Sequence, residues 1–170
     1  MNRALASWFT EPMKTSLRTG FSFGLTSGVI TTLGLMVGLY SGTHSRLAVF
    51  GGILTIAVAD ALSDALGIHI SEESQNTHPP RHIWESTLAT FFAKFMIALT
   101  FSVPVFLLSL ETAIIVSVIW GLCLLMGLSF LLARLQKIRP WPVIGEHLLI
   151  GAGVVGVTYV LGEWIRRTFG

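Results

Sequence analysis

The sequence predicts an all-α membrane protein with five transmembrane helices, on the strength of three observations. The chain of 170 residues is 52% hydrophobic and 12% charged, whereas a soluble domain is about 25% charged. The mean hydropathy is +0.73. Five apolar runs approach or exceed the roughly 20 residues that a helix needs to cross the hydrocarbon core. The connections between them are short, so no soluble domain fits.

The elements follow one another in a simple order. Residues 1–18 combine apolar and basic side chains, which predicts an interfacial segment lying on the anionic leaflet. Residues 19–170 form a single transmembrane domain. Turn-forming residues, including Pro79-Pro80 and Pro140, separate the runs. The predicted spans are residues 20–40, 47–70, 84–110, 112–133 and 144–164.

The basic residues at the span ends predict an N-in, C-out orientation. Seven would then be cytoplasmic, against three outside (Arg46, Arg166 and Arg167). The pI near 9.0 reflects these scattered helix-end charges, so we expect no nucleic-acid partner. We expect lipid as the surroundings, in the plasma (inner) membrane. The seven cytoplasmic residues are Arg3, Lys14, Arg18, Arg81, Arg134, Lys137 and Arg139.

Glycines recur every four residues along the first span, at Gly20, Gly24 and Gly28. Small residues on one stripe let helix backbones approach closely, and in lipid this is a main route to helix association. We therefore expect a two-fold homodimer with the first helices near its axis.

Asp60 and Asp64 are the most informative residues, because they interrupt an otherwise apolar span. A charged side chain at the bilayer centre costs about 2.5–3.5 kcal/mol, so the pair must face protein, water or an ion. Spacing i,i+4 puts both on one helix face. Neighbouring carboxylates repel each other unless a cation or a proton lies between them. This pattern predicts a cation or proton path, with Ser27 and Thr31 of the first span as facing hydroxyl contacts.

A second group of metal-ligand types follows the second span. His69, Glu72 and Glu73 end that helix, and together such side chains suit Fe²⁺, Mn²⁺ or Zn²⁺. They are candidates for the cytoplasmic mouth of the path, with a solvated acidic loop as the alternative. His78 and His82 are weaker candidates, because Pro79-Pro80 between them prevents a shared helical face.

Lys94 carries a positive charge well inside the third predicted span, and two roles are open for it. The simpler one is snorkelling of its ammonium to the interface. The other is an ion pair with Asp60 or Asp64 that a cation or proton displaces, which would make Lys94 part of the coupling. A permanent structural pair would remove the argument for transport.

Three stretches of the chain resemble signature sequences of the vacuolar iron transporter family. The resemblance spans nearly the whole chain, and Pro104 matches a family proline. It implies a homodimer that moves ferrous iron, and often manganese, out of the cytoplasm in exchange for protons, along a path between the first two helices. The stretches are GLTSGVITTLG (24–34), SDALGIHISEESQ (63–75) and LLIGAGVVGVTYVLG (148–162).

The chain departs from the family at the positions that matter for the metal. Ser27 stands where an aspartate is usual, Asp64 where a methionine is usual, and Ile56 near a common glutamate. The glutamate-rich cytoplasmic metal-binding domain of plant and fungal members is reduced to residues 71–83. The remaining carboxylates and hydroxyls suit hard cations such as Mn²⁺, Mg²⁺ or Ca²⁺.

These observations predict a proton-coupled exporter of divalent cations, with iron or manganese as cargo. We expect no enzyme activity and no resident cofactor. Two alternatives stay open. One is a membrane scaffold held by Asp-Lys pairs. The other is a membrane-embedded metal enzyme resembling the CDP-alcohol phosphatidyltransferases, although Ile56 replaces a glycine of that motif and its upstream half is absent.

Overall fold

The computed structural model describes residues 12–170, with side chains from residue 15, and this part of the chain is almost entirely helical. Five of its segments are long and apolar enough to cross a membrane, as predicted, with α4 and α5 together making one of them. The helices are α2 (Pro12–Thr43), α3 (Arg46–Ser74), α4 (Pro80–Thr100), α5 (Ser102–Leu107), α6 (Leu110–Leu135) and α7 (Pro140–Phe169).

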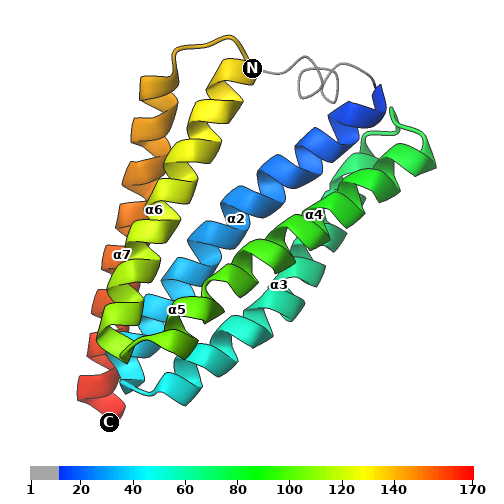
Figure 1. The fold of residues 1–170 in the computed structure, drawn as a ribbon. Helices are drawn as coiled ribbons and strands as arrows, with labels where there is room; N and C mark the ends of the chain where they lie inside the picture. The colour runs from blue at the N-terminus through cyan, green and yellow to red at the C-terminus, as the bar shows by residue number, and fades with distance from the viewer. Residues whose placement is uncertain (1–11) are drawn as a thin grey trace.

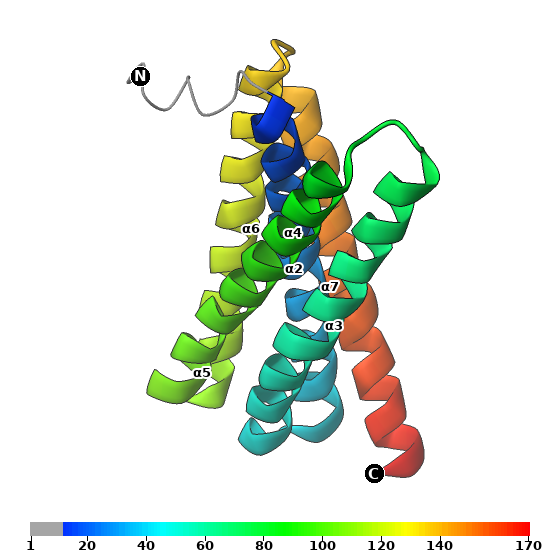
Figure 2. The same ribbon diagram turned by 90° about the vertical axis from the view of Figure 1, so that its right-hand side faces the viewer.

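Helix α2 is the centre of the bundle and packs against α3, α4, α6 and α7. Figure 1 shows α6 and α7 side by side on one flank of α2, and α3 with α4 on the other. Figure 2, viewed from the side of α3 and α4, shows these two helices in front of α2, with α6 and α7 behind them to either side. Val29, Leu33 and Met36 of α2 are fully buried, and they pack with Phe101 and Leu125 in the hydrophobic core.

Short turns join the long helices. His44, Asn76 and Lys137 each have positive φ within two residues of the end of a helix, at 49°, 54° and 58°. Asn and His tolerate this left-handed conformation better than most residues. Each turn reverses the chain within a few residues and leaves neighbouring spans antiparallel.

The third predicted span is one crossing but not one continuous helix. It breaks at Phe101, between α4 and α5. Pro104 explains the break, because it has no N–H to donate to the Thr100 carbonyl and its ring would clash with that group. Arg46 supports the end of α5 by donating to the carbonyl oxygens of Val105 at 2.8 Å and Leu108 at 2.6 Å.

The glycine stripe has a different partner from the one predicted. A Cβ added at Gly20 or Gly24 would collide with the backbone of α4, and one at Gly28 would collide with the side chain of Ile97. The stripe therefore packs α2 against α4 of the same chain. These glycines give no support to a dimer axis along the first helices, because α4 of the same chain covers them. The dimer itself stays a prediction that must rest on another surface.

Of the predicted interfacial segment, residues 1–11 lie outside the described part of the chain, and residues 12–18 form the start of α2. The beginning of α2 and the end of α7 lie at opposite ends of the bundle (Figure 1). This agrees with an odd number of crossings, while the N-in orientation stays a prediction.

Candidate functional site

Four polar side chains from three helices meet inside the bundle. Lys94 of α4 places its Nζ 2.5 Å from Oδ2 of Asp60 and in contact with Oδ2 of Asp64, both on α3. The ammonium also donates to Oγ of Ser27 on α2 at 2.9 Å. The Ser27 hydroxyl donates in turn to Asp64 Oδ2 at 2.6 Å. We call Ser27, Asp60, Asp64 and Lys94 the aspartate–lysine cluster.

The cluster lies at mid-depth in the bundle. Asp60 is the central residue of α3, which runs from Arg46 to Ser74. Lys94 is similarly central in the span from Pro80 to Leu107. The prediction that Lys94 snorkels to the interface is therefore wrong, and the alternative ion pair is present with both aspartates rather than one.

Close helix packing brings Lys94 to this position. At Gly28 an added Cβ would lie 3.2 Å from Cγ of Lys94, so the lysine stem runs along the glycine stripe of α2. With the stem held there, the ammonium reaches across to α3. The stripe that predicted a dimer instead assembles the cluster.

The cluster is more open on its acidic side than on its basic side. The Lys94 side chain is 2% exposed, whereas those of Asp60 and Asp64 are 28% and 20% exposed. The carboxylates thus form the more exposed side of the cluster and the ammonium forms its enclosed side. Two carboxylates face one ammonium, and no other basic side chain of residues 15–170 pairs with them. With both carboxylates ionised the cluster carries one net negative charge, which favours binding of a further cation or proton.

Thr31 does not join this cluster. Its hydroxyl donates to the Ser27 carbonyl at 2.9 Å. Thr31 instead lines an apolar groove of about 580 Å³ between α2, α3 and α7, together with Ile56. Thr31 and Ile56 each lie four residues from a cluster member, Ser27 and Asp60, so the groove approaches the cluster within one helical turn.

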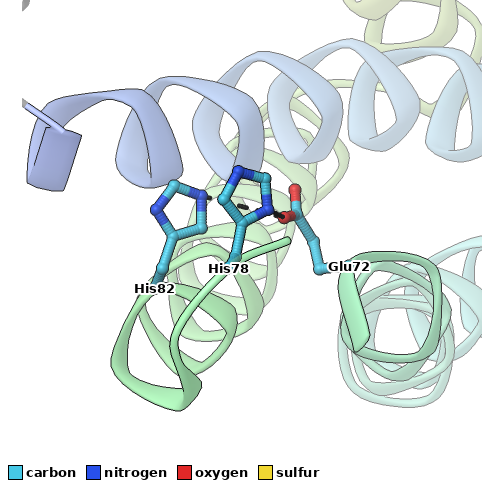
Figure 3. Close-up of side chains that lie close together, drawn as sticks. All are labelled: Glu72, His78 and His82. Carbon is cyan, nitrogen blue, oxygen red and sulfur yellow. Dashed lines mark ion pairs between the residues drawn. The ribbon is translucent and has the colours of Figure 1, made fainter. Parts of the chain in front are cut away.

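A second cluster forms where α3 connects to α4. Oε2 of Glu72 lies 2.8 Å from Nδ1 of His78 and 3.7 Å from Nε2 of His82. Figure 3 shows both imidazoles on the α4 side, facing the Glu72 carboxylate of α3. Glu72 and His82 are buried and His78 is half-buried. We call these three residues the Glu–His–His cluster.

The two histidines meet because of the prolines that separate them. Pro79 caps α4 and Pro80 begins it, which places His82 in the first helical turn and His78 just before the helix. The rings stack with centroids 4.1 Å apart and planes 8° from parallel. The residues share no helical face, as predicted, but their rings still meet beside Glu72.

The predicted mouth residues do not form one group. His69 Nδ1 lies 3.0 Å from the Thr87 hydroxyl, and its ring packs edge-on against Trp84. Glu73 is exposed. Only Glu72 of the predicted trio enters a cluster of potential ligands, and its partners are the two histidines that the sequence ranked lower.

Comparison with known proteins assigns no function to either cluster. The chain matches no protein-family model and no curated protein.

Proposed function

We propose that the protein transports divalent metal cations out of the cytoplasm in exchange for protons, with Asp60 and Asp64 as the intramembrane ligands. One observation carries the proposal. The buried ammonium of Lys94 lies between two carboxylates whose side chains are partly exposed. The chain thus already holds a positive charge where a transported cation would bind.

The chemistry of the ligand atoms limits which cations the site would prefer. Two carboxylates and the Ser27 hydroxyl offer only oxygen, which suits hard cations. The resemblance to the vacuolar iron transporters favours Fe²⁺ and Mn²⁺. Manganese satisfies both arguments, so we propose Mn²⁺ as the first cargo to test and Fe²⁺ as the second.

Charge balance supports proton exchange. A divalent ion added to a cluster of net charge −1 would leave an excess positive charge in a medium of low dielectric constant, which is costly. The Lys94 ammonium must then release a proton or move away from the carboxylates, and either event returns the cluster to neutrality. Protons that return after the metal departs restore the starting charge. This cycle is an antiport.

The test is metal flux into liposomes that contain the purified protein, with Mn²⁺, Fe²⁺, Co²⁺, Zn²⁺ and Ca²⁺ compared under a pH gradient. Asp60→Asn and Asp64→Asn keep side-chain shape and remove charge, so each should abolish or strongly reduce flux. Glu146→Gln makes the same chemical change at an exposed position of α7 and should leave flux unchanged. Full flux in the double asparagine variant would disprove the site.

A membrane scaffold is the second candidate, and the enclosure of Lys94 favours it. A buried ammonium that contacts both carboxylates also serves to lock α4 onto α3. On this alternative, the wild-type protein shows no flux of any cation in liposomes, and the asparagine variants lose stability rather than transport.

A further inference from the structure

We propose that the Glu–His–His cluster is a second metal site, specific for borderline transition-metal ions such as Zn²⁺, Co²⁺ or Fe²⁺. Each of Glu72, His78 and His82 offers one ligand atom, and the three atoms lie within 4.8 Å of one another. This inference does not depend on the proposed transport, because it concerns binding at a different place.

The spacing of the ligand atoms fits a tetrahedral ion. Metal–ligand bonds of about 2.0–2.1 Å at tetrahedral angles separate two ligand atoms by roughly 3.4 Å. The two distances to Glu72 Oε2, 2.8 Å and 3.7 Å, lie on either side of this value. Three protein ligands also leave the fourth coordination position for a water molecule.

One adjustment is needed for binding. The lone pair of an imidazole nitrogen lies in the ring plane, so two nearly parallel rings must tilt before both can reach one ion. His78 is free to make this movement, because it lies outside the helix and is half-buried. Glu72 and His82 are buried and supply the fixed part of the site.

The Glu72 carboxylate is incompletely satisfied without an ion. Within the described part of the chain its Oε2 is buried and makes no well-aligned hydrogen bond, and its contact with the His78 imidazole, with Nδ1 at 2.8 Å, is an ion pair only when that imidazole is protonated. Buried polar oxygens are normally paired, since leaving one unpaired costs free energy. A metal ion between the carboxylate and the imidazoles would supply a positive partner that needs no proton on either ring.

The site differs from the aspartate–lysine cluster in chemistry and in place. It combines two nitrogens with one oxygen, a set that prefers Zn²⁺, Co²⁺ or Fe²⁺ over Mg²⁺ or Ca²⁺. Glu72 follows Asp64 by eight residues on α3, a rise of about 12 Å. One ion cannot use both sites, and an ion here would tie the α3–α4 connection to the end of α3.

The test is titration of the tag-free, full-length protein in detergent with Co²⁺, followed by visible absorption and by displacement with Zn²⁺. We expect the intense bands of tetrahedral Co²⁺. His78→Ala and His82→Gln should each lower the affinity by at least about 10-fold, because loss of a ligand exceeds the effect of losing its outer-shell partner. Circular dichroism and gel filtration check that each variant is folded. His78→Ala should disturb folding least, because His78 lies outside the helix.

Three variants serve as controls. Glu73→Gln changes the exposed neighbour of Glu72, and His44→Asn removes a histidine from a turn at the other end of the bundle. Both should retain Co²⁺ binding. The Asp60→Asn/Asp64→Asn double variant should also retain it while losing flux, which separates this inference from the transport proposal. Unchanged affinity in both histidine variants, or loss of the bands in the double aspartate variant, would overturn the assignment.

Discussion

At the scale of single residues, Lys94 determines the charge balance at the centre of the bundle. Its ammonium is the only basic group of the described side chains that contacts Asp60 and Asp64. Removing one partner of a buried ion pair leaves the other uncompensated, at a cost of about 3–5 kcal/mol. Without Lys94, the uncompensated partners would be two carboxylates. A divalent cation could then neutralise them in place of the lysine.

Lys94→Met should therefore lower the thermal unfolding midpoint of the metal-free protein, and Mn²⁺ should restore much of the loss. A ligand that binds only the folded state stabilises it by mass action. The measurement is the unfolding midpoint with and without Mn²⁺, for this variant and the wild type. Lys137→Asn removes one positive charge at an exposed turn and suits its positive φ, so it serves as the control. Absence of any rescue by Mn²⁺ in Lys94→Met would support the scaffold alternative.

At the scale of elements, the packing of α2 on α4 links the fold to the aspartate–lysine cluster. The glycine stripe lets α4 approach closely enough for the Lys94 stem to lie against Gly28. Any side chain that separates the two helices therefore also withdraws the ammonium from α3. Stability and charge placement are coupled through a single helix interface.

Gly24→Leu should destabilise the folded chain by at least about 1–3 kcal/mol, the usual cost of overpacking. Its Cβ would meet the Thr90 carbonyl oxygen at 2.6 Å, and backbone cannot yield as a flexible side chain can. Gly127→Leu is the matched control, because nothing lies within 4 Å of a Cβ at that exposed position of α6. Denaturant unfolding in detergent compares the two. Equal stability of both variants would show that α2 and α4 are not in close contact.

At the scale of the whole molecule, both polar clusters lie on the α2–α3–α4 side of the bundle. The α6–α7 pair packs on the other flank of α2 and contributes no member to either cluster. We therefore expect the transport path to follow α3, from the aspartate–lysine cluster toward the turn that carries the Glu–His–His cluster.

Flux should depend on pH in one direction. Protons compete with metal for the same carboxylates, so the apparent affinity for Mn²⁺ should fall as the pH drops from about 7.5 to 5.5. In liposomes an opposing proton gradient should drive Mn²⁺ movement, and a protonophore should slow it. Active protein whose flux ignores both pH and protonophore would be a channel or uniporter instead of an antiporter.

The number of spans and the position of the paired acids follow from the sequence alone. Lipid requires about 20 apolar residues per crossing, so the runs before and after each turn are recognisable without a structure. Helical periodicity likewise puts Asp60 and Asp64 on one face. These are local properties of a single helix, and they depend on no distant residue.

The tertiary structure decided which helix each of these faces meets. Ser27 and Lys94 are 67 residues apart in the sequence, and nothing local indicates that Gly28 covers the lysine stem. The sequence likewise could not show that the glycine stripe packs against α4, because a stripe of small residues fits any closely packed helix. His78 and His82 meet only because the turn after α3 and the proline start of α4 orient both toward Glu72. Periodicity defines a face within one helix, whereas the pairing of faces depends on how all the helices pack.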